Sequence, residues 1–302
     1  MGQRIGVVVN PTSGRGRGAA MGAAAVARLR ASGGEVVDLS GDSHAHSTDN
    51  ARGAVASGGI DVLAVVGGDG MAHLGVNACA GTPVALAIIA AGTGNDNARS
   101  LGLPIRQPEQ AADLISSGAV RTIDAGCMRS SDGDRWWIGV LGGGFDSVVT
   151  ERAHRWSWPK GPMRYNLAVA RELPVFTAIP YAIEVDGHRV ETTAMLVAVG
   201  NGPAFGGGML VLPEAKFDDG LLDVLILHEV SVLEFLKVFP RVFKGTHVTH
   251  PKIEILRGEK VRLETTGIMA QADGERFHPM PIDVEVAPGA LRVVAPSSRY
   301  VT

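Results

Sequence analysis

Apolar and polar positions in the first third of the chain predict buried strands that alternate with helices. Uninterrupted apolar runs such as 61–66 and 84–90 are typical of strands covered on both faces, and the alanine-rich segment 19–31 favours a helix. This alternation predicts a parallel sheet between two layers of helices. The predicted strands are 4–9, 35–39, 61–66, 84–90 and 120–124, and the predicted helices are 19–31, 48–57 with Ser47 as N-cap, 71–80 and 107–117.

After residue 124 the pattern changes to short strands at the spacing of a β-sandwich. Gly187, which follows Asp186, marks a hairpin turn, and two helical insertions at 162–176 and 232–243 interrupt the strands. We therefore expect a second domain that is mostly β. Its predicted strands are 136–141, 179–185, 189–199, 221–227, 252–256, 260–264 and 281–286, and a last strand at 291–295 is expected to return to the first domain.

The chain is long enough for two compact domains, with 302 residues of which 45% are hydrophobic and 20% charged. Lys and Arg number 28 against 31 Asp and Glu, so no bulk attraction to nucleic acid follows. Cys79 and Cys127 form no CxxC motif and suit a reducing, cytoplasmic setting. No apolar run approaches the ~20 residues of a membrane span, and the first strand begins too early for a signal peptide.

Glycine is enriched, with 40 residues, and it gathers in three loops that each follow a predicted strand: 10–14, 67–70 and 91–96. Small residues at the carboxyl end of a strand expose backbone N–H groups that can face phosphate. Asp69 in the second loop can hydrogen-bond a ligand or help to hold a metal ion. Each loop alone is a weak signal, because an ordinary turn has the same composition. Together, at the ends of three strands of an open sheet, they predict a phosphate-binding cleft.

Two acidic segments lie in the second half of the chain. Residues 213–221 place adjacent carboxylates before a glycine, which suits a hard cation such as Mg²⁺. Residues 272–275 place two carboxylates around a glycine, so that one could act as a general base and the other could orient a metal ion. By composition alone, each segment is also an ordinary β-turn.

Taken in order, the segments NPTSG, GGDG, GTGND, PEAKFDDGLLD and ADGE resemble the diacylglycerol kinase catalytic family. This family includes sphingosine-type lipid kinases and is distantly similar to the NAD kinases, and the layout resembles that of its soluble bacterial members. The resemblance covers nearly the whole chain. It implies a three-layer, nucleotide-binding α/β domain, here 1–124 with a returning strand at about 288–302, and a β-sandwich lipid-substrate domain, here 125–287.

The resemblance also implies roles for individual residues. Glu275 matches the proton acceptor of the family, with Asp273 beside it as a competing base. Asp219 would bind a structural Mg²⁺ together with the backbone carbonyls of Lys216 and Leu221, apart from the Mg²⁺ that travels with ATP. The implied nucleotide-binding residues are Asn10, Pro11, Thr12, Ser13, Gly14, Gly67, Gly68, Asp69, Gly70, Met71, Gly92, Thr93, Gly94, Asn95 and Asp96.

The implied activity is ATP-dependent phosphorylation of diacylglycerol to phosphatidic acid. The glycine loops and the acidic pair would then meet across a single crevice. A cytoplasmic protein that contacts the inner face of the membrane peripherally is expected, and a homodimer is left open. One stretch combines basic and amphipathic side chains that suit an anionic interface or, equally, a domain core and its rim: Arg152, Arg155, Trp156, Trp158, Lys160, Met163, Arg164 and Tyr165. The apolar face of segment 232–243 is expected to belong to the core.

The sequence departs from the family pattern after GGDG. The family usually continues with Thr and then Asn and Glu, whereas this chain has Met71, His73 and Leu74, and Asn97 replaces an aromatic residue after GTGND. Two alternatives stay open. One is a kinase for another lipid (a sphingoid base, ceramide or another glycerolipid) or for NAD, although GTGND and ADGE favour a lipid. The other is a nucleotide-binding sensor without catalysis, which the changes at Met71 and Leu74 allow. A dinucleotide oxidoreductase is disfavoured, because no GxGxxG motif with a downstream acidic residue is present.

Overall fold

The computed structural model describes residues 2–156, 158 and 162–297, except the side chains of residues 154, 162 and 164–166. It divides into two compact units, residues 1–125 with 287–302 and residues 126–286. Each unit has a hydrophobic core of its own. Part of the predicted membrane stretch is not described: Lys160 lies outside the described residues, and so do the side chains of Arg164 and Tyr165.

The first unit is built on a parallel sheet. Its strands are ordered β2–β1–β3–β4, and the end of β15 (Ile282–Val294) lies beside β4. Val293 of β15 pairs with Leu86 of β4 in parallel register, so the last strand of the chain belongs to this sheet. The other strands are β1 (Arg4–Val9), β2 (Glu35–Asp38), β3 (Val62–Gly67) and β4 (Ala85–Ala90).

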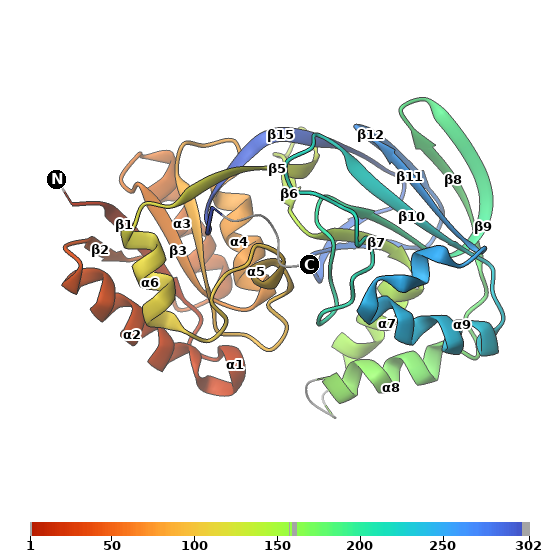
Figure 1. The fold of residues 1–302 in the computed structure, drawn as a ribbon, viewed down its shortest axis with the longest axis horizontal. Coiled ribbons are helices and arrows are strands. Elements are labelled where there is room, and N and C mark those ends of the chain that lie inside the picture. The colour runs from red at the N-terminus through yellow and green to blue at the C-terminus, as the bar shows by residue number, and fades with distance from the viewer. Residues whose placement is uncertain (1, 157, 159–161, 298–302) are drawn as a thin grey trace. The chain divides into compact units, whose positions relative to one another are not determined.

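Helices cover both faces of this sheet (Figure 1). α2 (Gly18–Ala31) and α6 (Pro108–Ser116) pack together on one face. α3 (His44–Ala56) and α4 (Asp69–Cys79) pack together on the other. A short helical turn, α1 (Ser13–Gly16), precedes α2.

The alternation of side chains along β3 explains its sequence. Val62, Ala64 and Val66 lie in the core beneath α2 and α6. Val65 points to the opposite layer, since a Cβ placed on Gly75 of α4 would lie 3.2 Å from Val65 Cγ1. Because both faces are covered, every residue of the strand is buried and the run is apolar throughout. The predicted three-layer α/β architecture is confirmed.

Two details of the first unit differ from the prediction. The N-cap of α3 is Ser43, because its backbone is extended and its Oγ accepts the N–H of His46 at 3.1 Å. Ser47 lies inside the helix, and its Oγ accepts the N–H of Gly41 at 3.0 Å. A short helix, α5 (Asp96–Ser100), begins within the third glycine loop and is absent from the prediction, because that loop is dominated by turn-forming residues.

The second unit consists of antiparallel strands that branch at β9 (His188–Gly200). The first half of β9 pairs with β8 (Ile179–Val185), and its second half pairs with β7 (Val140–Gly144) on one side and β10 (Leu222–His228) on the other. β5, which begins in the first unit, pairs with β6. The remaining strands are β5 (Val120–Met128), β6 (Arg135–Trp137), β11 (Ile253–Gly258), β12 (Lys260–Glu264), β13 (Met269–Ala272) and β14 (Glu275–Pro279).

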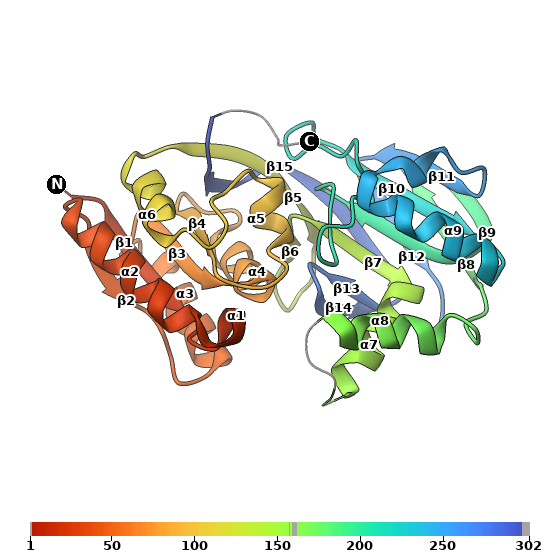
Figure 2. The ribbon, with the colours of Figure 1, turned by 60° about the horizontal axis from the view of Figure 1, so that its bottom comes forward.

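Two hydrophobic cores meet on β10. Leu222, Val224 and Ile226 lie in the core between the sheets of the sandwich. Leu225 and Leu227 lie in a second core, beneath the helices that cover the other face (Figure 2). The predicted β-sandwich is therefore confirmed, with a helical layer added to it. The helices of this layer are α7 (Phe145–Arg155), α8 (Pro162–Glu172), α9 (Val232–Val238), η1 (Phe239–Lys244) and η2 (Thr246–Thr249).

The predicted hairpin turn is confirmed, because Asp186 and Gly187 join β8 to β9 with φ of 49° and 84°. Three other details differ. The segment 136–141 forms two strands, β6 and β7, rather than one. The runs 281–286 and 291–295 belong to the single strand β15, and α7 is absent from the prediction because three glycines precede it.

No helix among the described residues combines the length and the apolar character that crossing a bilayer demands.

Replacing Ile226 by Ala is expected to destabilise the second unit by about 2–5 kcal/mol, because this fully buried side chain would leave a cavity in the sandwich core. Ile255→Ala on the neighbouring strand β11 is the matched control. Ile255 is 37% exposed, so its loss should have less than about half of that effect. Thermal and urea unfolding followed by circular dichroism measures both, and equal destabilisation would contradict the assignment of the core.

Candidate functional site

The three glycine loops lie at the carboxyl ends of adjacent strands, as the sequence predicts. They follow β1, β3 and β4, which are neighbours in the parallel sheet. Backbone hydrogen bonds join them: Asn10 N–H donates to Val66 at 3.0 Å, and Ala91 N–H donates to Gly67 at 2.8 Å. This edge is where open α/β sheets bind ligands.

Close backbone contact explains two of the glycines. A Cβ on Gly14, whose φ is +60°, would lie 2.1 Å from the carbonyl oxygen of Ala91. A Cβ on Gly92 would lie 2.5 Å from Gly68 Cα. Any side chain at these positions would push the loops apart.

Asp69 joins the second loop to the third. Its Oδ2 accepts the N–H of Asn95 at 2.8 Å, and its Oδ1 accepts the N–H of Asp96 at 2.7 Å. Asn95 is itself buried, and its side-chain amide exchanges two hydrogen bonds of 3.0 Å with the backbone of Gly92. The sequence suggested a ligand or metal contact for Asp69. In the structure both of its oxygens also hold the shape of the loops.

Several features make this edge suitable for an anion. α4 begins at Asp69, its N-cap is Gly68, and no side chain caps it. The N–H groups of its first turn and the helix dipole therefore favour negative charge. Two guanidinium groups are held against the loops, since Arg17 donates to Gly14 at 2.9 Å and Arg99 donates to Gly94 at 3.0 Å. Arg17, Arg99 and the hydroxyl-bearing Thr12 and Thr93 are exposed, Ser13 is half-buried, and Asp96 is buried.

The departures from the family pattern lie on α4. Met71 and Leu74 are only 5% and 4% exposed, so both side chains contribute to the core of the first unit. His73 is half-buried and lies 3.2 Å from the side chain of Asn77, one turn further along the helix.

The acidic pair of the second unit lies in the hairpin between β13 and β14. Asp273 and Gly274 have φ of 52° and 84°, as a two-residue turn requires. Asp273 is buried, and its carboxylate accepts the N–H of Gly139 at 2.9 Å and that of Ile138 at 3.2 Å. Glu275, at the first position of β14, is exposed. The two carboxylates therefore have different surroundings, although they stand two residues apart.

The predicted structural Mg²⁺ site has an arginine in it. Arg257 Nη2 lies 2.5 Å from Asp219 Oδ2, and Arg257 Nε lies 3.0 Å from Asp223 Oδ1. The other oxygen of Asp219 accepts the N–H of Leu221 at 3.2 Å. No cluster of three or more metal-ligating side chains occurs among the described residues. As arranged, these groups do not fit a cation, because a cation would have to displace the guanidinium of Arg257. The metal site at Lys216, Asp219 and Leu221 stays a prediction from the sequence.

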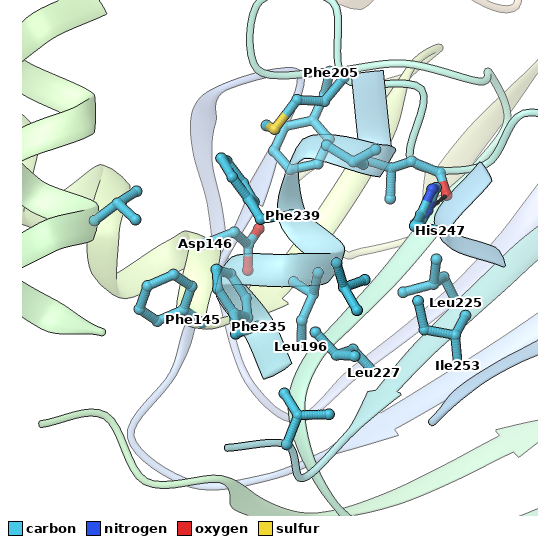
Figure 3. A pocket seen from close by; sticks show the side chains of 16 residues that line it. Phe145, Asp146, Leu196, Phe205, Leu225, Leu227, Phe235, Phe239, His247 and Ile253 are labelled. Atoms are coloured by element: carbon cyan, nitrogen blue, oxygen red, sulfur yellow. Dashed lines mark hydrogen bonds between the residues drawn. The ribbon is translucent and has the colours of Figure 1, made fainter. Parts of the chain in front are cut away.

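A pocket in the helical layer of the second unit is absent from the sequence analysis (Figure 3). Its volume is about 80 Å³. Asp146 and His247 are the polar side chains of a lining that is otherwise apolar. The other lining residues are Phe145, Val169, Leu196, Phe205, Met209, Val211, Leu225, Leu227, Val230, Phe235, Val238, Phe239, Val242 and Ile253.

Asp146 is an unusual carboxyl group. It lies in the first turn of α7, is 6% exposed, and its Oδ1 has no hydrogen-bond partner. Burial raises its pKa to about 7, opposed by the N–H groups of the helix turn. Figure 3 shows it between Phe145 and Phe239. The available signal in the sequence was an acidic residue two positions after a strand that ends in three glycines.

The stretch 152–165 is partly engaged within its own unit. Arg152 bonds the buried Glu172 at 2.5 Å, and Arg155 bonds Glu151 at 3.0 Å. Trp156 packs against the helical core. Trp158, which is 79% exposed, remains available to a partner together with Met163.

Known proteins resemble this chain over most of its length. Residues 4–128 match the diacylglycerol kinase catalytic domain, and residues 139–295 match the YegS C-terminal NAD kinase beta sandwich-like domain. A curated protein named diacylglycerol kinase from Mycobacterium tuberculosis is 37% identical over 295 residues, which cover 97% of this chain and 95% of that protein.

Two solved structures share the fold. A diacylglycerol kinase from Bacillus anthracis has a TM-score of 0.73 at 22% identity, covering 98% of this chain and 97% of that one. An NAD kinase from Archaeoglobus fulgidus in complex with ATP has a TM-score of 0.54 at 14% identity, covering 98% and 95%.

The resemblance found in the sequence motifs is thus confirmed by the domain matches and by the identity with the mycobacterial protein. The chain belongs to the diacylglycerol kinase catalytic-domain family and is a phosphotransferase whose acceptor is an alcohol group.

Proposed function

We propose that this protein transfers the γ-phosphoryl group of ATP to the free hydroxyl of diacylglycerol and so forms phosphatidic acid. The observation that carries the choice of a lipid acceptor is the pocket of the second unit, where a buried carboxyl group stands in an apolar lining. Such a lining suits the part of a lipid where an acyl chain meets a polar group, and a volume of about 80 Å³ takes in a section of one chain. The name of the mycobacterial relative supports diacylglycerol among the lipids.

ATP is assigned to the glycine loops of the first unit. The N–H groups at the start of α4 and the guanidinium groups of Arg17 and Arg99 would attract the phosphates. Thr12, Ser13 and Thr93 would donate hydroxyl hydrogen bonds. Asp69 and Asn95 would act by fixing the loops, because their polar atoms already bond backbone groups.

Glu275 is proposed as the general base, and Asp273 as the residue that positions its hairpin. The exposed carboxylate of Glu275 can take the proton of the acceptor hydroxyl. The hydroxyl oxygen then bonds the γ-phosphorus, the bond from this phosphorus to the bridging oxygen breaks, and ADP leaves. Mg²⁺ would arrive with ATP and neutralise phosphate charge.

The lipid is assigned to the pocket of the second unit. Aromatic and aliphatic side chains would surround a section of an acyl chain, and Asp146 would accept a hydrogen bond from the polar end of the lipid. A buried carboxyl group without a partner for one oxygen lowers stability, and functional sites are where such groups persist. We place the reaction at the inner face of the membrane; a homodimer stays a prediction from the sequence.

The proposed function is tested with labelled ATP and a panel of acceptors resolved by thin-layer chromatography: diacylglycerol, ceramide, a sphingoid base, monoacylglycerol and NAD. Label is expected in phosphatidic acid. Label in another lipid or in NADP would replace diacylglycerol as the acceptor. ATP binding without label in any product would favour the silent nucleotide sensor.

Glu275→Gln is expected to lower the rate of phosphoryl transfer by about 10²-fold or more, with little change in ATP affinity or melting temperature. Asp273→Asn should instead destabilise the fold by about 1–3 kcal/mol, since it weakens two buried hydrogen bonds to backbone N–H groups. Steady-state kinetics and thermal unfolding separate the two effects. Glu259→Gln, at another exposed glutamate of the same unit, is the control. Wild-type turnover in Glu275→Gln would remove this residue from the mechanism.

Asp146→Asn is expected to stabilise the protein at neutral and higher pH. Because the folded-state pKa of Asp146 is raised to about 7, the folded protein binds a proton more readily than the unfolded chain. The contribution of Asp146 to the free energy of unfolding should therefore be fully present below about pH 4. It should be lost as the pH rises through 7, by on the order of a few kcal/mol.

The measurement is the melting temperature of both proteins from about pH 4 to 8. The difference between them should be small at the acidic end and widen with pH. Asp132→Asn, at an exposed aspartate, is the control and should track the wild type. A gap between Asp146→Asn and the wild type that does not vary with pH would contradict the buried, proton-binding state of Asp146.

A further inference from the structure

The outer side of α9 and η1 carries apolar side chains that nothing in its own unit covers. Leu233 is 73% exposed, Leu236 53%, Phe243 50% and Val232 39%. We define these four residues as the outer α9 face. Scattered single apolar residues on a surface are normal, but four within twelve positions of one helical segment form a patch of the kind that marks a binding surface.

The outer α9 face is distinct from the face that packs into the protein. Phe235 and Val238 of the same helix are buried and line the pocket. Leu233, Leu236 and the exposed Lys237 are three and four positions apart, so they share the opposite side. The sequence predicts that the apolar face of segment 232–243 belongs to the core. In the structure only two of the five apolar residues of α9, Phe235 and Val238, are buried.

The charge around the outer α9 face is positive. Residues 229–252 hold four cationic side chains (Lys237, Arg241, Lys244 and Lys252) against two carboxylates, whereas the whole chain has a net charge of -3. One of the two carboxylates, Glu234, is turned toward His250, 3.4 Å away. Lys237 and Lys244 are exposed beside the apolar patch. Apolar side chains flanked by lysines suit a surface with a hydrocarbon interior and anionic headgroups.

A row of aromatic rings connects the outer α9 face to the lipid pocket. The ring of Phe243 lies 6.0 Å from that of Phe239, edge to face. Phe239 stacks on Phe235 at 5.6 Å, and Phe235 meets Phe145 at 5.3 Å. Phe145, Phe235 and Phe239 line the pocket (Figure 3). A lipid surface held on the outer face would therefore lie next to the wall of the acceptor site.

We propose that the outer α9 face is the surface by which this protein docks on an anionic bilayer, with Leu233, Leu236 and Phe243 entering the acyl region. Lys237 and Lys244 would then meet the headgroup phosphates. A second copy of the chain fits less well, because a two-fold contact through this face would bring the lysines of both copies together. The inference rests on the proposed function only in naming a lipid surface as the partner.

The test is co-sedimentation with vesicles made of equal parts phosphatidylglycerol and phosphatidylcholine. Leu233→Ser with Leu236→Ser should lower the partition coefficient about tenfold or more. Val37→Ser is the matched control, since Val37 is 42% exposed on β2 of the other unit, and it should bind as the wild type does. Melting temperatures of all variants verify folding.

The lysines are tested separately. Lys237→Gln with Lys244→Gln should weaken binding to the anionic vesicles severalfold and leave binding to pure phosphatidylcholine unchanged. Arg30→Gln, at an exposed cation of α2, is the control. Added salt should reduce wild-type binding toward that of the lysine variant.

Unchanged partition of the serine double variant would overturn the docking proposal, and so would a dimer that this variant dissociates while vesicle binding persists. Activity on a short-chain diacylglycerol dispersed as monomers separates docking from catalysis. The serine variant should keep this activity and lose activity on vesicles, whereas equal losses would place these residues in the acceptor site and overturn docking. If the wild type fails on the short-chain substrate, the proposed function fails while the partition result still decides docking.

Discussion

The carboxylate of Asp69 is the contact on which the geometry of the first unit's loops depends. It accepts two consecutive backbone N–H groups, those of Asn95 and Asp96, and so fixes the third glycine loop against the second. Charge-assisted hydrogen bonds of this kind are stronger than neutral ones. The same two loops approach closely at Gly68 and Gly92, which is possible because a side chain at Gly92 would collide with the opposite backbone and glycine has none.

Asp273 repeats this device in the second unit. Its buried carboxylate accepts the consecutive N–H groups of Ile138 and Gly139 and anchors a hairpin turn. In both motifs the aspartate next to a glycine holds the backbone. In the hairpin, the neighbouring acidic side chain Glu275 is exposed, and we propose it as the general base. This short acidic motif thus combines a buried carboxylate that bonds the backbone with an exposed one.

Sequence patterns predicted those parts of the fold that periodicity and turn chemistry determine. The buried strands β3 and β4 and the Asp186-Gly187 turn belong to this class. The structural roles of Asp69 and Asp273 could not be predicted. In a sequence, an aspartate that accepts backbone N–H groups cannot be told from one that binds a ligand. The pocket of the second unit could not be predicted either. Its lining residues come from segments between residues 145 and 253 that only tertiary packing brings together. The two apolar sides of α9 could not be told apart without knowing what covers each of them.

The alternation along β10 has a consequence for how such enzymes diverge. Leu222, Val224 and Ile226 serve the sandwich core, whereas Leu225 and Leu227 face the pocket. Mutations at the second pair would reshape the proposed lipid pocket while the first set keeps the scaffold intact. If the pocket holds the acceptor as proposed, lineages that share this framework would be free to change their preferred fatty acid one substitution at a time.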